Sequence, residues 1–268
     1  MLLFTTLRIG LPCPCSWGQD MNVSVGHIGK RHGEDSLNDR IFDVMEHIEY
    51  RRIVTPEDFE EIGDLRANAF DARVVYSKKL GNSAVDEMDR AKNAYVFGMY
   101  YDGTLVSTVR MHVVSRENPD SFSVRMFPNT MKPLIEQGMS FIDPTRFAID
   151  EEVSHEIPGL PILTLRIPFM ATVHFNANAC LALVKEAHAP FYRRVFRSTQ
   201  LAGPAKFDEF AVPLVLFAGA RQYEKDICRR YPMFNSTAAE RRMMFDKKVN
   251  AVPPLTILPT AKYVAKAA

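Results

Sequence analysis

Residues 142–150 read IDPTRFAID, and the proline in this stretch limits the possible folds more than any other residue. The apolar residues around it are typical of a buried strand, but Pro144 has no N–H group to donate to a neighbouring strand. Proline is therefore tolerated in a sheet only at an edge or a bulge. Asp143 and Arg146 add two opposite charges to the same stretch. We expect a core strand that opens at Pro144 and offers backbone N–H groups to a ligand.

Patterns on both sides of this strand predict a mixed sheet with helices packed on it. Thr55 and Pro56 are typical of a helix start, and apolar spacing continues that helix to about residue 71. Asp102-Gly103 joins two β-rich runs into a hairpin at 93–115. Further strands are expected at 50–55, 179–184 and 212–217, and further helices at 132–137, 162–177, 189–201 and 236–245.

The chain has 268 residues, of which 47% are hydrophobic and 24% charged, so one sizeable core is expected. Residues 26–39 are polar and contain three glycines, and we expect residues 1–48 to be a flexible N-terminal extension. One globular domain then spans 49–247, and residues 248–268 form a tail. We expect translation to begin at Met21, although the apolar start leaves a weak signal peptide open.

Composition argues against several classes of partner. A formal net charge of +1 provides no global field for nucleic acid. The apolar runs fall short of the roughly 18–20 residues of a transmembrane span, which leaves peripheral contact with a membrane open. The four cysteines fit neither a disulfide framework nor zinc knuckles, so we expect a cytoplasmic protein without a metal. Motifs of nucleophilic hydrolases and phosphate-binding loops are missing.

Two arginines stand out by their positions. Arg66 falls between Ile62 and Phe70, inside the apolar stripe of its helix. The methylene groups of Arg66 could pack against the core while its guanidinium reaches solvent, or the guanidinium could point into a cleft. Arg110 shares a strand face with His112, which for the strand taken alone indicates a solvated face.

Four motifs together resemble a known family in order and spacing. They are Arg66-x-x-x-Phe70, Asp86-x-x-Asp89, Val106-Ser-Thr-Val-Arg110 and Asp143-Pro-Thr-Arg146-Phe147. The N-acyl-homoserine lactone synthases have similar blocks: an Arg-x-x-x-Phe helix, an Asp-x-x-Asp loop, a Gly-Thr-x-Arg strand and a Glu-x-Ser-Arg-Phe strand. The resemblance covers roughly residues 50–218. It implies the α/β fold of the GCN5-related N-acyltransferases (GNAT), with a mixed, mostly antiparallel central sheet, a splayed strand and helices on both faces.

Two departures from these blocks change the expected acceptor. Tyr76 stands where the lactone synthases have a tryptophan, and Asp143 stands where they have a glutamate. The sequence is more similar to the long-chain N-acyl amino acid synthases, which share the fold. This resemblance implies a transferase that moves a fatty acyl group from the 4′-phosphopantetheine of acyl carrier protein to the α-amine of an amino acid. No further cofactor is expected.

Two parts of the sequence indicate which acyl donor the protein uses. Acetyl-coenzyme A users of this fold bind the pyrophosphate with a glycine-containing loop, whereas residues 150–156 here are acidic and contain no glycine. Arg193, Arg194 and Arg197, helped by Lys185, offer a basic patch for the acidic surface of a carrier protein. A solvated helix face is the alternative.

We expect direct acyl transfer, because a thioester is activated and an unprotonated amine is a competent nucleophile. Asp143 is the expected base, and backbone N–H groups around Pro144 would hold the thioester carbonyl. Arg66 and Arg110 would bind the acceptor carboxylate, since a guanidinium matches two carboxylate oxygens. The other substrate-binding residues expected are Phe70, Tyr76, Asp86, Asp89, Arg146 and Phe147.

Among these residues, Arg146 is expected to pair with Asp86 or Asp89 and to fasten their loop, while Phe70 and Tyr76 wall the site. The acyl pocket is expected between the opened strand and strand 179–184, lined by the helix at 162–175.

Two other functions stay open. One is a homoserine lactone signal synthase that uses S-adenosylmethionine, against which Tyr76 counts. The other is a catalytically silent acyl-carrier-binding or sensor protein on the same scaffold. The sequence indicates neither the acceptor amino acid nor the acyl chain length.

Overall fold

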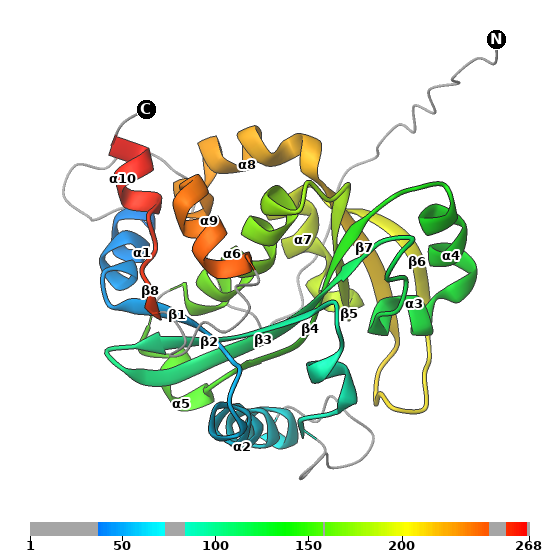
Figure 1. Ribbon diagram of the computed structural model, residues 1–268, viewed down its shortest axis with the longest axis horizontal. Helices are drawn as coiled ribbons and strands as arrows, with labels where there is room; N and C mark the ends of the chain where they lie inside the picture. The colour runs from blue at the N-terminus through cyan, green and yellow to red at the C-terminus, as the bar shows by residue number, and fades with distance from the viewer. Residues whose placement is uncertain (1–36, 73–83, 158, 247–255, 267–268) are drawn as a thin grey trace.

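The computed structural model describes residues 37–72, 84–157, 159–246 and 256–266, and the strands of this part form one eight-stranded sheet (Figure 1). The strands are β1 (Ile48–Arg52), β2 (Ala94–Tyr101), β3 (Thr104–Val114), β4 (Phe141–Ile149), β5 (Ala179–Lys185), β6 (Thr199–Ala205), β7 (Leu214–Ala220) and β8 (Thr256–Ile257). Their order is β6-β7-β5-β4-β3-β2-β1-β8. All neighbours are antiparallel except β4 and β5, which are parallel.

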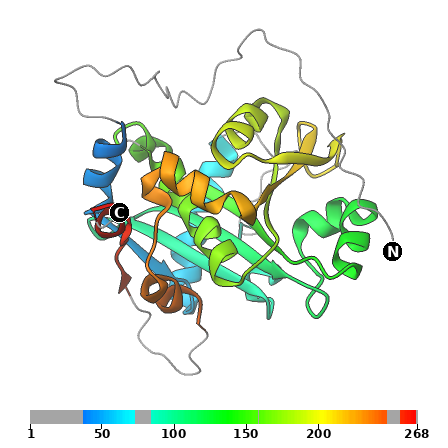
Figure 2. The same cartoon turned by 90° about the horizontal axis from the view of Figure 1, so that it is seen from above.

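Helices cover both faces of this sheet (Figures 1 and 2). Helix α2 (Pro56–Ala72) contacts β3 and β4 on one face, and α6 (Leu160–His174) contacts the same strands on the other. The remaining helices are α1 (Leu37–Met45), α3 (Phe122–Met126), α4 (Pro128–Glu136), α5 (Glu151–Ser154), α7 (Ala189–Phe196), α8 (Glu224–Arg230), α9 (Ala238–Phe245) and α10 (Ala261–Lys266). Short 3-10 helices are η2 (Glu87–Arg90), η3 (Glu186–His188), η4 (Arg221–Tyr223) and η5 (Pro232–Phe234).

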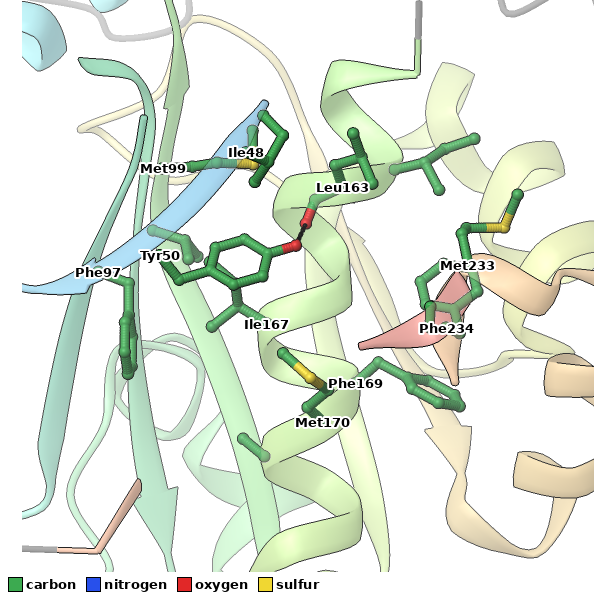
Figure 3. Close-up of a cluster of buried hydrophobic side chains, with 14 of the residues drawn as sticks. Ile48, Tyr50, Phe97, Met99, Leu163, Ile167, Phe169, Met170, Met233 and Phe234 are labelled. Atoms are coloured by element: carbon green, nitrogen blue, oxygen red, sulfur yellow. Dashed lines mark hydrogen bonds between the residues drawn. The ribbon is translucent and has the colours of Figure 1, made fainter. Parts of the chain in front are cut away.

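Helix α6 lies at the centre of the main core, because its sequence, LPILTLRIPFMATVH, is apolar around nearly its whole circumference. Four side chains of β1 and β2 face it from the sheet (Figure 3): Ile48, Tyr50, Phe97 and Met99. The hydroxyl of Tyr50 donates to the carbonyl of Leu163 at 3.1 Å, so the polar atom of this buried ring has a partner. Helix η5 packs on the other side of α6.

The one charged residue of this helix, Arg166, is completely buried. Its guanidinium donates to the two carboxylate oxygens of Glu240 at 2.5 and 2.9 Å. It also donates to the carbonyls of Met233 and Asn235 at 2.7 and 2.6 Å. Glu240 in turn accepts from the hydroxyl of Thr260 at 2.5 Å. Every charge in this network has its partners, and the network ties α9 and the C-terminal segment to α6.

Strand β4 pairs with β5 at only two positions. The register joins Phe141 to Ala179 and Ile142 to Cys180, and no further pairs follow. The two strands therefore separate immediately before Pro144, the residue that cannot donate to a ladder. A bulge interrupts the pairing of β4 with β3 around Arg146, whose φ is 50°. The predicted opening of this strand is confirmed.

The helix predicted at 189–201 is wrong in its second half. Helix α7 ends at Phe196, and Arg197 adopts a left-handed conformation with φ of 51°, which ends a helix. Residues Thr199–Ala205 instead form the edge strand β6. A glycine and a proline inside this strand weaken its sequence signal. The helix predicted at 132–137 begins earlier, at Pro128, and the short α3 precedes it.

The expected flexible extension and tail also need correction where the structure describes them. Residues Leu37–Met45 form α1, and its Ile41 is fully buried in the main core. In the tail, β8 pairs with β1, and Ala261 of α10 is buried. These short segments fold because distant parts of the chain cover them, which local patterns do not reveal. The expected start at Met21 lies outside the described residues.

Glu240→Ala should destabilise the protein by about 3–5 kcal/mol, because Arg166 then stays buried without its ionic partner. Urea unfolding followed by circular dichroism measures this loss. Glu209→Ala is the control, since Glu209 is exposed and such changes stay within about 0.5 kcal/mol. Equal stability of the two variants would contradict the role given to Glu240.

Candidate functional site

Five charged side chains meet beside β3 and β4 on the face that α2 covers. Arg66 of α2 donates to Asp89 at 2.8 Å. Arg110 of β3 lies 2.5 Å from Asp86 and 3.2 Å from Asp89. Arg146 of β4 donates to the second oxygen of Asp86 at 2.7 Å, as the sequence predicts. We call these five residues the ion cluster, which contains every charged residue of the four motifs except Asp143.

A short 3-10 helix, η2, holds the two aspartates of the ion cluster. Asp86 accepts from the N–H of Met88 at 2.9 Å, and Asp89 accepts from the N–H of Asp86 at 3.0 Å. This reciprocal capping box fixes both carboxylates through the backbone. Each carboxylate has further lone pairs, and these accept from the arginines.

Burial divides the ion cluster into an inner part and a rim. The side chains of Arg66 and Asp89 are 0% exposed and that of Arg110 is 1% exposed, whereas Asp86 keeps 29% and Arg146 keeps 12%. Both inner arginines pair with carboxylates of the chain and do not reach solvent, although Nε and one terminal nitrogen of Arg66 have no hydrogen-bond partner among the described residues. The expected binding of the acceptor carboxylate by Arg66 and Arg110 is therefore not supported. These two arginines hold η2 against the sheet.

The rim presents a carboxylate beside a guanidinium. Burial raises the pKa of Asp86, but the guanidinium groups of Arg110 and Arg146 outweigh this effect and bring the pKa below its ordinary value. Asp86 is therefore ionised at neutral pH. At the rim, Asp86 and Arg146 are paired with each other at 2.7 Å, and both side chains stay partly exposed.

Asp143 lies outside the ion cluster. It is fully buried, and its two oxygens accept from the N–H and the hydroxyl of Ser123 at 2.9 and 2.6 Å. Its carboxylate anchors α3 to β4. The expected role of Asp143 as the base is therefore not supported, because both oxygens are occupied and neither reaches solvent. Ser123 belongs to none of the four motifs, so no sequence pattern predicts this contact.

His112, to which the sequence assigns no role, lies opposite Asp143 in the β3–β4 register and is fully buried. Its Nε2 lies 3.0 Å from the carbonyl of Met88. A carbonyl only accepts, so Nε2 carries the proton. Nδ1 has no hydrogen-bond partner among the described residues. Burial and then Arg110 lower the pKa of His112, which keeps the ring neutral. The strand face expected to be solvated is therefore a buried polar layer.

The three aromatic residues of the predicted site have different positions. Phe70 is buried against Ala148, and the Arg146 guanidinium lies 5.9 Å from its ring centre. Phe147 is partly buried and packs against the main core. Tyr76 lies outside the described residues. Only Phe70 therefore supports the ion cluster in the described part of the chain.

An apolar pocket lies where β4 and β5 separate, beneath α6. Pro144 and the β5 residues Cys180, Leu181 and Ala182 line it from the sheet. Helix α6 adds Leu165, Pro168, Phe169, Thr172 and Val173, and α7 and α8 add Tyr192, Phe196 and Ile227. The sequence predicts the acyl pocket between these strands and beneath this helix, and the pocket has that position.

The two cysteines in the described part of the chain are poor nucleophiles. Burial raises the pKa of the Cys180 thiol to about 12 and that of Cys228 to about 11. Both thiols therefore stay protonated at neutral pH. The described residues also include no group of His, Cys, Asp and Glu that could hold a metal, and no helix long and apolar enough to span a membrane.

The predicted basic patch is present on α7. Arg193, Arg194 and Arg197 are exposed, and Lys185 is partly buried. The Arg193 guanidinium lies 5.1 Å from the ring centre of Phe217. Arg197 pairs with Asp226 at 3.3 Å, so part of the positive charge is offset.

A comparison with protein families decides the identity of the site. The model of the N-acyl amino acid synthase FeeM family matches residues 61–219, which is more than half of the chain and includes all four motifs. The chain belongs to this family. It is therefore an N-acyltransferase. No protein with a curated description is significantly similar to it in sequence.

Solved structures support the fold of this synthase. FeeM, an N-acyl amino acid synthase from uncultured soil microbes, is similar with a TM-score of 0.56 and 13% identity, over 67% of this chain and 93% of that chain. At this identity the likeness shows the fold alone. Weaker likenesses include BjaI, a CoA-dependent acyl-homoserine lactone synthase (TM-score 0.45, 14% identity, 66% and 83% covered). Another is an acyl-CoA N-acyltransferase from Pseudomonas aeruginosa (TM-score 0.45, 13% identity, 65% and 98% covered). The expected mixed, mostly antiparallel sheet with a splayed strand and helices on both faces is confirmed.

Asp89→Ala should destabilise the synthase by about 3–5 kcal/mol, because it leaves Arg66 and Arg110 buried with fewer partners. Asp86→Ala, at the exposed rim, should lower stability less. Urea unfolding of both variants measures the difference. A greater loss for Asp86→Ala would contradict the division into inner part and rim.

The stability of the synthase should fall as the pH drops below about 6.5, the ordinary pKa of histidine. The lowered pKa of His112 means that the unfolded chain binds a proton more readily than the folded one, so His112 contributes stability above this pH and loses it below. Unfolding free energies at pH about 7.5 and 5.5 test this. His112→Gln should reduce the difference, whereas the control His155→Gln, at an exposed position, should not. An unchanged difference in His112→Gln would contradict this account.

Proposed function

We propose that the synthase transfers a long-chain fatty acyl group from the 4′-phosphopantetheine of acyl carrier protein to the α-amine of an amino acid. The observation that carries this proposal is the separation of β4 from β5 at Pro144, which leads directly into the apolar pocket beneath α6. An extended thioester fits between two parted strands, because unpaired strand edges offer hydrogen bonds to it. An apolar pocket stabilises an alkyl chain by removing it from water.

The chemistry after β4 favours a carrier protein over coenzyme A as the donor. The side chain of Asp150 accepts from the N–H groups of Glu152 and Val153, and Glu151 adds another negative charge. This segment is therefore occupied by carboxylates and is unfavourable for a pyrophosphate. The single phosphate of a carrier-bound pantetheine requires less positive charge, and the exposed arginines of α7 match the acidic surface of a carrier protein.

The rim of the ion cluster is the proposed site for the acceptor. Asp86 and Arg146 are the partly exposed ion pair of the cluster, with 2.7 Å between their charged groups. An α-amino acid carries an amine and a carboxylate close together, and it would bind by inserting these groups between the two side chains. Arg66 and Arg110 hold η2 against the sheet and so position this pair, without touching the acceptor. Carboxylate binding is thus assigned to the partly exposed Arg146 instead of the buried Arg66 and Arg110.

The proposed reaction is direct. The unprotonated amine attacks the thioester carbon and forms a C–N bond, and the C–S bond then breaks. The pantetheine thiol leaves with the proton that the amine loses, which water carries between them. Freed backbone N–H groups near Pro144 hold the oxyanion. No covalent intermediate on the enzyme is needed.

Mass spectrometry of a competition reaction tests this proposal. The synthase is incubated with a long-chain acyl carrier protein, an equimolar mixture of the standard amino acids and S-adenosylmethionine. An N-acyl amino acid is the expected product, and the same acyl chain on coenzyme A should react more slowly. A homoserine lactone product, or binding of the loaded carrier protein without any product, would contradict the proposal.

Cys180→Ala should keep at least about half of the wild-type kcat, because a protonated thiol in the pocket does not form an acyl-enzyme. Steady-state rates with the acyl donor and acceptor measure this, and Cys228→Ala is the matched control. A loss of several orders of magnitude for Cys180→Ala alone would indicate a covalent route.

A further inference from the structure

The apolar pocket has a charged end. Its lining includes Arg221, which follows β7, and Glu224, which begins α8. The N–H of Arg221 donates to the carbonyl of Asn178, immediately before β5, at 3.0 Å. Arg221 therefore lies beside the first residues of β5, and Glu224 follows it three residues later in the chain. Pro144, in contrast, lies beyond the last β4–β5 pair, on the other side of the pocket.

The register of the sheet gives the distance between these two ends. Ile142 pairs with Cys180, so Pro144 is level with Ala182, four positions along β5 from Asn178. At about 3.3 Å per residue, this separation is roughly 13 Å along the strand direction. An acyl chain whose thioester lies at the opening and whose tail fills the pocket would therefore end near Arg221.

The Arg221 side chain has an unmet hydrogen bond at this place. Its Nε is buried and has no hydrogen-bond partner among the described residues. A buried donor without an acceptor is unfavourable, because it has lost its hydrogen bonds to water without gaining another. Arg166, the structural arginine of α6, differs because its Nε and both terminal nitrogens all donate to protein oxygens. Arg66 also has nitrogens without a partner, but its side chain is fully buried. Arg221 is partly buried and lines the pocket, so its free Nε can meet a ligand oxygen there.

We propose that Arg221 and Glu224 bind an oxygen at the far end of the acyl chain, and that the preferred acyl group carries a terminal hydroxyl. A hydroxyl accepts from the guanidinium and donates to the carboxylate, so it satisfies both groups. A terminal carboxylate would be repelled by Glu224, and a methyl end would leave Nε unpaired. This inference rests on the proposed function, because it takes the thioester to lie at the opening.

Isothermal titration calorimetry with S-acyl-pantetheines tests the inference without any turnover. The ligands are a series from decanoyl to hexadecanoyl, each with a methyl, a hydroxyl or a carboxyl terminus. The hydroxyl form of the best-fitting length should bind the wild-type synthase about tenfold more tightly than the methyl form. Arg221→Met should remove this preference. Lys225→Met, which removes a neighbouring exposed charge outside the pocket, should retain it.

Equal binding of the methyl and hydroxyl forms, tighter binding of the carboxyl form, or no binding of any form would overturn the inference. A preference that survives in Arg221→Met would overturn it as well. The proposed function fails by a different result, the absence of an N-acyl amino acid in the competition reaction. A hydroxyl preference without that product would reject the proposed function and retain the binding site.

Discussion

The missing N–H group of Pro144 is the constraint on which the rest of the structure depends. A parallel pair of strands needs a regular series of backbone hydrogen bonds, and β4 cannot continue that series beyond Ile142. The sheet therefore divides into β1–β4 with β8 on one side and β5–β7 on the other. An open strand edge inside a core costs free energy unless another group pairs with it. A bound thioester provides such a group. The strand opening that costs free energy is therefore also the proposed binding site.

Two buried charge networks hold the sides of this opening. On one face, Arg166 and Glu240 tie α6 to the C-terminal segment. On the other face, the ion cluster fastens η2 and α2 to β3 and β4. Such networks add little net stability, but losing one partner is strongly destabilising. They therefore fix the arrangement of helices around the opening more than they strengthen the fold.

The sequence predicts the parts of this arrangement that depend on local chemistry. Asp102-Gly103 defines the hairpin, Pro144 defines the opening, and the motif spacing brings Arg146 to Asp86. The sequence does not predict which charged residues are buried. Strand alternation predicts which side chains share a face of the sheet, but it does not predict which helix or loop packs on that face. Arg110 is covered by the segment of η2 and Asp143 by α3, and the short sequences of these elements carry little periodic signal.

The expected roles of Asp143 and Arg110 are not supported for this reason. A motif gives the position of each residue, but the partner that decides its role lies outside that motif. Asp143 meets Ser123, and Arg110 meets Asp86. Edge strand β6 was missed for a related reason, since its glycine and proline are tolerated only because it pairs on one side with β7.

The most direct test of the account is a crystal structure of the synthase with a long-chain S-acyl-pantetheine bound. The account predicts density for the pantetheine between β4 and β5, with the carbonyl beside Pro144 and the alkyl tail in the pocket beneath α6. Density on the α2 face of the sheet, or a closed β4–β5 ladder with the ligand elsewhere, would contradict it.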